Sequence, residues 1–285
     1  MSTDRSPNAE SITYWNEDAG PRWARNAEAI DLQLAPFLDP LCRAAAVGQG
    51  ERVLDIGCGA GALSLRLAAS VGDGGGVLGV DISEQLLALA RRRAGERADP
   101  PVEFRRADAQ LEPFDEATFD RVVSRFGVMF FEDSIAAFKN FRCALRPGGT
   151  LSFVCWAPLS ENPWMGIPGE VLLRHVEPPE PADPDGPGPF RFCEPEYARQ
   201  LCGRAGFADV SVDRLQGLLI LGGPGTFDDA ISFMLEIGPA ARVREAEQTI
   251  RLAVRDDLRR TMRPYMGVNG VELPYAAWLV HARCA

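Results

Sequence analysis

The sequence of 285 residues predicts an α/β fold built on a parallel sheet that helices cover on both sides. In the first half of the chain, short apolar runs alternate with segments of helical periodicity. The runs are apolar on both faces, as strands are when they lie between two helical layers. Hydrophobic residues make up 46% of the chain and charged residues 25%, as in an ordinary globular protein. The length suits one elaborated domain or a domain with a cap.

Residues 49–157 are predicted to form the ligand-binding core of the fold. Strands are expected at 52–57, 74–83, 102–109, 119–127 and 151–157, with helices at 62–71, 84–98 and 134–145. A turn is expected at 146–150, where the sequence is RPGGT.

The remaining segments are expected to surround that core. Residues 1–48 are interpreted as an N-terminal helical lid, and 158–193 as a loop-rich insertion over the active site. The centre of the insertion, 177–189, is rich in proline and is expected to be a mobile surface loop. A helix and a strand at 194–222 continue the core, a helical cap follows at 223–273, and 274–285 is the last core strand. Within the cap, a capping box of Thr226 and Asp229 opens one helix, and a long helix is expected at about 239–262.

Composition excludes several classes of function. The formal net charge of −10 opposes binding to a nucleic-acid backbone, because a basic surface normally supplies most of the affinity for it. No apolar run reaches the length of a membrane span, and the polar N-terminus does not read as a secretory signal, so a cytoplasmic protein is expected. Seven cysteines without a CxxC pair indicate reduced thiols, and two histidines far apart in sequence predict no metal site.

A glycine turn follows the first strand in the stretch VLDIGCGAGALSL. Such a turn places backbone N–H groups and a helix N-terminus beside a ligand. A nucleoside triphosphate loop would need a lysine after the last glycine, and a dinucleotide fold would need the spacing GxGxxG, but Gly57, Gly59 and Gly61 alternate. Asp55 comes two residues before the turn, where a pyrophosphate would disfavour it and a positively charged ligand would favour it.

S-adenosylmethionine is a ligand of that kind, because it carries a sulfonium, an ammonium and only one carboxylate. Asp81 ends the second strand and is expected to accept hydrogen bonds from the ribose hydroxyls, a position that dinucleotide folds use in the same way. Asp108 ends the third strand and is expected to accept one from the adenine amino group. Ile82 and Ala109 are expected to sandwich the adenine ring.

The motifs VLDIGCGAG, GVDIS, RRADAQLEPFDEATFD and LRPGGTLSF resemble those of class I S-adenosylmethionine-dependent methyltransferases, most of all the type 11 or UbiE-like group. The resemblance covers about residues 50–157. It implies a Rossmann-like sheet of seven mostly parallel strands with a final antiparallel strand, and S-adenosylmethionine as cofactor with S-adenosylhomocysteine as product. Cys58 is expected to contribute only its backbone N–H, and Ser124 to offer its carbonyl to the cofactor.

Three regions are candidates to meet the methyl acceptor, which in such a fold lies beyond the carboxyl ends of the strands. Each region admits an alternative role in simple packing. In the N-terminal segment, Tyr14 and Trp23 are expected near the methionyl end of the cofactor, where an aromatic face suits a sulfonium. The expected acceptor contacts after the fourth and fifth strands are Phe126, Met129, Phe130, Trp156 and Trp164.

The expected reaction is an SN2 transfer to a small, apolar or aromatic metabolite, driven by proximity and alignment. His175, in the insertion, is the one imidazole considered as a base, and a surface or cap position is the alternative interpretation. Other interpretations remain open: a cyclase or binding regulator on the same fold, a protein methyltransferase, or a dinucleotide oxidoreductase. The sequence does not indicate the oligomeric state.

Overall fold

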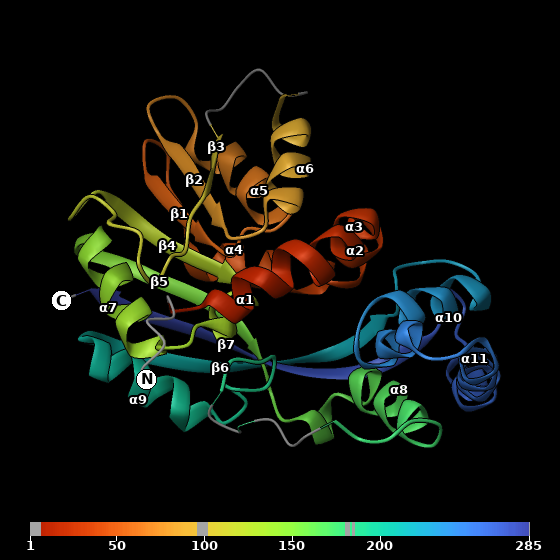
Figure 1. Cartoon of the computed structure of the whole chain (residues 1–285). Helices are drawn as coiled ribbons and strands as arrows, with labels where there is room; N and C mark the ends of the chain where they lie inside the picture. Colours follow the sequence, from red (N-terminus) through yellow and green to blue (C-terminus); the bar gives the residue numbers. More distant parts are fainter. Residues whose placement is uncertain (1–6, 96–101, 180–182, 184–185, 285) are drawn as a thin grey trace.

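The core of the protein is a seven-stranded sheet with the order β3-β2-β1-β4-β5-β7-β6 (Figure 1). The structure is a computed structural model that describes residues 7–95, 102–179, 183 and 186–284. The strands are β1 Arg52–Ile56, β2 Gly76–Asp81, β3 Val102–Arg106, β4 Phe119–Arg125, β5 Leu145–Trp156, β6 Phe207–Ile220 and β7 Glu272–Cys284. β7 pairs antiparallel with β5 and β6, and the other neighbouring strands are parallel. The expected fold class is confirmed.

Helices cover both faces of this sheet. They are α4 Leu38–Ala45, α5 Ala62–Val71, α6 Glu84–Gly95, α7 Ser134–Ala144 and α9 Pro195–Ala205. Side chains alternate along a strand, so Phe153 and Trp156 of β5 face opposite sides. The ring of Phe153 contacts Phe138 of α7, whereas the ring of Trp156 contacts Phe37 just before α4. α7 and α4 therefore lie on opposite faces of the sheet.

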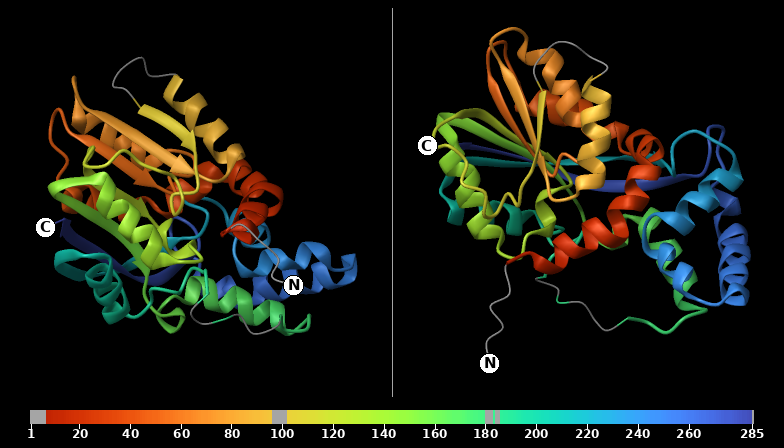
Figure 2. Two further views of the ribbon diagram at one scale, coloured as in Figure 1. Left: turned by 60° about the vertical axis from the view of Figure 1, so that its left-hand side comes forward. Right: turned by 45° about the horizontal axis from the view of Figure 1, so that its top comes forward.

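The N-terminal segment is helical, as expected from Ala9 onward. It contains α1 Ala9–Thr13, a π-helical turn η1 Tyr14–Asp18, α2 Ala19–Arg25, α3 Ala27–Gln33 and η2 Ala35–Phe37. Figures 1 and 2 show these helices in red, running past one end of the sheet between the core and the cap. Asp18 and Arg22 connect them to the cap, because Arg244 pairs with Asp18 and Arg22 Nη1 donates to the carbonyl of Glu236.

The cap has a hydrophobic cluster of its own, separate from the main core. Its elements are α8 Pro163–Leu173, α10 Phe227–Glu236, η5 Pro239–Glu245, α11 Gln248–Met262 and η6 Arg263–Tyr265. The capping box predicted at the start of α10 is confirmed, since Thr226 Oγ1 accepts from the N–H of Asp229 and Asp229 accepts from the N–H of Thr226.

The insertion at 158–193 is less loop-rich than expected. After the short turn η4 Leu159–Glu161 it forms the eleven-residue helix α8, which starts with Pro163 in its first turn. Val171 and Leu172 of α8 are buried in the cap cluster, and this burial stabilises a helix that composition alone did not reveal. In the predicted surface loop at 177–189, residues 180–182, 184 and 185 lie outside the described residues, and the described ones belong to neither a helix nor a strand.

The single long helix expected at 239–262 is wrong. A 3-10 helix, η5, buries Ala240, Ala241 and Val243, and α11 begins only at Gln248. Ala246 and Glu247 between them have extended backbone angles. Tertiary packing of the small apolar side chains of η5 overrides the continuous helical pattern.

The turn expected at 146–150 is also different. These residues belong to a bulged start of β5, in which Leu145 pairs with Phe119 and Thr150 with Arg121. Gly148 has a φ of +79°, which lets the backbone shift its register there. The last strand starts at Glu272, slightly before the expected residue 274.

Among the described residues, no helix combines the length and the hydropathy that a membrane crossing requires.

Candidate functional site

The glycine turn lies at the carboxyl end of β1. The strand order reverses at β1, because β2 and β3 follow on one side of it and β4 and β5 on the other. In open α/β sheets this reversal opens a crevice for ligands. Gly57, Gly59 and Gly61 all have positive φ angles. A side chain at Gly57 would come within 2.8 Å of Gly127 Cα and one at Gly61 within 2.8 Å of Phe104, but a Cβ at Gly59 would meet nothing within 4 Å. Packing thus requires glycine at positions 57 and 61, whereas the space beside the Cα of Gly59 is open.

Asp55, two residues before the turn, is a buried carboxylate with one free oxygen. Its exposed fraction is 1%, and its Oδ2 accepts a hydrogen bond of 2.6 Å from Ser64 Oγ. Within the described part of the chain, Oδ1 has no hydrogen-bond partner. Burial raises the pKa of Asp55 to about 7, although the Ser64 hydroxyl and the Arg125 guanidinium act in the opposite direction.

Arg125, the last residue of β4, is a second charged group beside the turn, and sequence reasoning did not identify it. Its side chain is 11% exposed, and its Nη2 lies 2.9 Å from Asp31 Oδ1 on α3. Asp31 also binds Arg93, whose Nη1 donates to the carbonyl of Ala60 in the glycine turn. Nη1 of Arg125 is buried without a partner among the described residues. A buried unpaired donor and a buried unpaired acceptor of opposite charge therefore lie near the same turn.

Asp81, at the end of β2, holds the glycine turn from the other side. Its Oδ2 accepts from the N–H of Gly59 and its Oδ1 from the N–H of Ser83, both at 2.8 Å. Burial raises the pKa of Asp81, while these backbone donors lower it. The next residue, Ile82, is half-buried, and its carbonyl accepts from the side chain of Asn16 in the N-terminal segment.

Asp108, just beyond β3, lies near the same edge of the sheet. It accepts from the backbone N–H of Gln110 and, with both carboxylate oxygens, from the side-chain amide of Asn8. Ala109 beside it is buried, and its carbonyl accepts from Asn140. Asp55 near the end of β1, Asp81 at the end of β2 and Asp108 just beyond β3 thus lie toward the carboxyl ends of three neighbouring strands.

Two smaller residues of the expected set have structural partners. The N–H of Cys58 donates to the carbonyl of Val80, so the backbone donor expected to face the ligand is already used. Ser124 is fully buried, and its hydroxyl donates to the carbonyl of Ile56 and accepts from the N–H of Gly127. Ser124 therefore fastens β4 to the start of the glycine turn.

The aromatic residues expected to line the acceptor site pack against one another. Phe126 has a φ of +64° and stacks on Trp156, with ring centroids 4.0 Å apart. Phe37 contacts both rings at their edges, and Trp164 of α8 lies 4.8 Å from Trp156. Phe126 and Trp156 are buried and Trp164 is half-buried. Met129 has no exposed surface in this structure.

A second aromatic group connects the N-terminal segment to the loop after β4. Trp15 is its centre, with the rings of Tyr14, Trp23 and Phe130 within 6 Å of it. Tyr14 is 49% exposed, and Trp23 and Phe130 are half-buried. The structure thus brings Tyr14, Trp23 and Phe130 together, apart from the stack that contains Trp156.

The two histidines have separate places. His175 follows α8 in the cap, where its Nε2 lies 3.1 Å from Asp257 Oδ2 of α11. Arg174 and Arg260 pair with the same carboxylate, and the pKa of Asp257 is lowered by these partners against the opposing effect of burial. His281 lies within β7 and bonds Ser152 of β5. His175 therefore links two cap helices.

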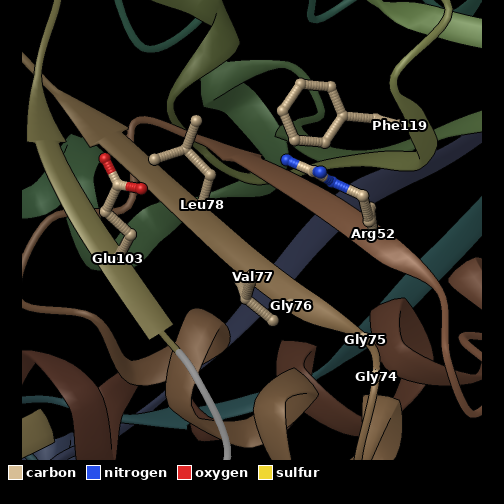
Figure 3. Close-up of a pocket in the computed structure, with 8 residues that line it drawn as sticks. All are labelled: Arg52, Gly74, Gly75, Gly76, Val77, Leu78, Glu103 and Phe119. Carbon is tan, nitrogen blue, oxygen red and sulfur yellow. The ribbon is translucent and has the colours of Figure 1, made fainter.

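One groove of about 240 Å³ lies at the opposite end of the strands from the glycine turn (Figure 3). Arg52 at the start of β1, Gly76 at the start of β2 and Glu103 of β3 line it. In the described ranges, no group of three or more His, Cys, Asp or Glu side chains could hold a metal ion.

Comparison with known proteins shows a similarity to methyltransferases. Residues 53–149 match the family model described as a methyltransferase domain. The aklanonic acid methyltransferase DauC of Streptomyces sp. is 38% identical over 104 residues, which cover 36% of this chain and 47% of the relative. The demethylmenaquinone methyltransferase of Staphylococcus saprophyticus is 28% identical over 184 residues, 60% of this chain and 76% of the relative.

Among solved structures, the YcgJ protein of Bacillus subtilis has the same fold, with a TM-score of 0.57 and 18% identity, covering 86% of this chain and 97% of that one. Residues 53–149 are thus similar to a methyltransferase domain, and most of the chain shares the fold of solved structures such as YcgJ. The chain spans about half the length of the first curated relatives it matches.

Proposed function

We propose that the protein is a methyltransferase that uses S-adenosylmethionine to methylate a small molecule. The observation that carries this proposal is the pair of unpartnered atoms beside the glycine turn, Asp55 Oδ1 and Arg125 Nη1. The amino-acid end of S-adenosylmethionine carries an ammonium and a carboxylate, which are complementary to these two groups. A buried charge without a partner is costly, so a ligand that supplies both partners is favoured.

The remaining polar groups at the strand ends suit the rest of the cofactor. Asp81 has lone pairs left for the two ribose hydroxyls, because a carboxylate accepts about four hydrogen bonds and two are used. Asp108 is proposed to accept from the adenine amino group, and Ile82 and Ala109 are proposed to lie on either side of the ring. Tyr14 and Trp23 are proposed to approach the sulfonium from the N-terminal segment.

The cofactor supplies a methyl group on a positively charged sulfonium. The protein's share of the work is to align an acceptor with that carbon, since an in-line displacement depends on alignment more than on proton transfer. A protein base is not obligatory in this proposal. His175, the candidate base, is held by Asp257 in the cap, where it joins α8 to α11.

The acceptor is proposed to be apolar or aromatic. Support comes from the aromatic side chains after β4 and β5, of which Phe130 and Trp164 keep exposed surface. The names of the relatives also support a small-molecule acceptor, because those proteins act on aklanonic acid and on demethylmenaquinone. α8 and the N-terminal helices are proposed to enclose the acceptor between core and cap.

The N-terminal segment is proposed to act as a lid over the cofactor. Asn16 donates to the carbonyl of Ile82 and accepts from the N–H of Glu84, and Gln85 donates to the carbonyl of Asn16. Lowered hydrogen exchange of residues 9–25 on addition of S-adenosylhomocysteine would support the lid, and unchanged exchange would contradict it.

The test of the function is mass spectrometry of reactions with S-adenosylmethionine and a panel of quinones and aromatic polyketides. A product heavier by one methylene unit, together with S-adenosylhomocysteine, is the expected result. A product of unchanged mass would indicate a cyclase. A thermal shift with NAD and none with S-adenosylmethionine would indicate an oxidoreductase.

A further inference from the structure

We propose that Asn8 is a positioning residue that holds Asp108 in place to select the adenine amino group of the cofactor. This inference rests on the proposed function, because it assigns a specificity role within the same site. Asn8 precedes α1 and is 5% exposed, although it lies near the start of the chain.

Asn8 makes a set of contacts that a simple helix-capping residue would not make. Its Nδ2 donates to Asp108 Oδ1 at 3.0 Å and Oδ2 at 2.9 Å, and to Gln110 Oε1 at 3.1 Å. Its backbone N–H donates to Glu132 Oε2, and its Oδ1 accepts from the backbone N–H of Glu132. No side-chain cap bond to α1 is made. All these partners lie in the loops after β3 and β4, 100 to 124 residues away in the sequence.

The backbone of Asn8 supports this arrangement. Its φ of 61° and ψ of 10° lie in the left-handed region, which asparagine tolerates better than most residues. In this conformation the amide donates to Asp108, while the reciprocal pair with Glu132 fixes the backbone. The N-terminal segment is therefore held at Asn8, whose side chain contacts Asp108, the residue proposed to bind adenine.

The amide of Asn8 fixes the orientation in which the Asp108 carboxylate accepts hydrogen bonds. With Nδ2 and the Gln110 N–H as donors, Asp108 presents its remaining lone pairs as acceptors. An amino group at position 6 of the purine can donate to them, whereas a carbonyl at that position would face another acceptor. Discrimination by a site built to bond one group is large when the analogue leaves polar groups unpaired.

The experiment compares the binding of S-adenosylhomocysteine and S-inosylhomocysteine, which carries an oxo group at that position, by calorimetry. The variants are Asn8→Ala and the isosteric Asn8→Asp, which replaces the donor with an acceptor. Thr13→Ala is the matched control, because Thr13 is exposed and its hydroxyl bonds the carbonyl of Ala9 in its own helix. Thermal unfolding of each variant verifies that the fold is intact.

Wild type and Thr13→Ala are expected to prefer the adenine ligand by about 100-fold. Asn8→Ala is expected to weaken S-adenosylhomocysteine by about 10-fold and the inosine analogue by less than about 3-fold. Asn8→Asp is expected to weaken S-adenosylhomocysteine further through repulsion between the two carboxylates.

An equal loss for both ligands would overturn the inference, because it would reduce Asn8 to a structural role. Tighter binding of S-adenosylhomocysteine by Asn8→Ala would also overturn it, since the amide would then compete with adenine. Failure of the wild type to bind S-adenosylhomocysteine would instead refute the proposed function, and the inference with it.

Discussion

We expect Asp55 to make the affinity for S-adenosylhomocysteine depend on pH. In the free protein, burial raises the pKa of its carboxyl group to about 7, so the carboxyl is largely neutral below that pH. An ammonium beside it favours the ionised form and lowers the pKa in the complex. Binding therefore releases a proton below pH 7, and affinity falls as the pH is lowered. S-adenosylhomocysteine is expected to bind about 25-fold more weakly at pH 5.5 than at pH 7.5, as an upper value, because each unit below the pKa costs up to a factor of ten.

The substitution that isolates this effect is Asp55→Asn, which keeps an acceptor for Ser64. We expect the variant to bind S-adenosylhomocysteine weakly at both pH values, with the pH dependence removed. The same substitution should make the folded protein more stable. A carboxyl group whose folded pKa lies above its unfolded value of 3.8 contributes less to folding as the pH rises from about 4 to 7. Asp55→Asn is thus expected to raise the free energy of unfolding at pH 7.5 by at most about 4 kcal/mol.

Calorimetry at several pH values, in buffers of different ionisation enthalpy, counts the protons released on binding. Asp81 is the natural comparison, because burial raises its pKa too, and it remains in the Asp55→Asn variant. A wild-type affinity that is flat from pH 5.5 to 7.5 would refute the reasoning. So would a pH dependence that Asp55→Asn retains in full.

The other predictions concern the cofactor pocket, the cap and the aromatic stack. Asp81→Ala is expected to weaken S-adenosylhomocysteine by ~1.5–3 kcal/mol, because charged hydrogen bonds are lost; unchanged affinity in calorimetry would exclude the ribose assignment. Arg125→Gln is expected to weaken the same ligand by about 10-fold and to leave the affinity for a ligand without the methionyl carboxylate nearly unchanged, whereas equal losses would contradict the carboxylate role. His175→Ala is expected to lower kcat by less than about 10-fold and the free energy of unfolding by about 1 kcal/mol; a loss of ~10²–10⁴ in kcat would identify His175 as the base. Trp156→Ala is expected to lower the free energy of unfolding by about 3–5 kcal/mol, measured by chemical denaturation, because the indole is buried and stacked; a stable variant with weakened acceptor binding alone would contradict that.

Local patterns were enough to predict most elements of the fold. The apolar run before Gly57 and the alternation along 208–221 both became strands. Thr226 and Asp229 are three residues apart, so their capping box is visible in the sequence itself. The carboxylates near the carboxyl ends of β1, β2 and β3 could be placed at one edge of the sheet because the carboxyl ends of parallel strands lie together.

The contacts that the sequence did not indicate are long-range. Asn8 reaches Asp108 across 100 residues, and Arg125 reaches Asp31 across 94. No periodicity or motif connects such pairs, and an isolated asparagine near a terminus carries no local signal. Asn162 is a further example, because its buried side chain bonds the backbone of Ala157 at the end of β5 and of Ala276 in β7.

Packing explains why the structure differs from the interpretation of two aromatic residues. Phe126 and Trp156 were expected to face an acceptor, but they stack on each other and leave less than a tenth of their surface exposed. An aromatic cluster in a sequence is compatible with either a ligand wall or a filled core. Only the neighbours supplied by distant segments, such as Phe37, distinguish the two.

The measurement that tests the central claim most directly is a crystal structure of the protein with S-adenosylhomocysteine. We expect the ligand at the carboxyl ends of β1, β2 and β3. Its amino-acid end should lie between Asp55 and Arg125, with its ribose on Asp81 and its adenine amino group on Asp108. A ligand in the groove beside Arg52 at the other end of the strands, or absence of ligand at saturating concentration, would contradict the account.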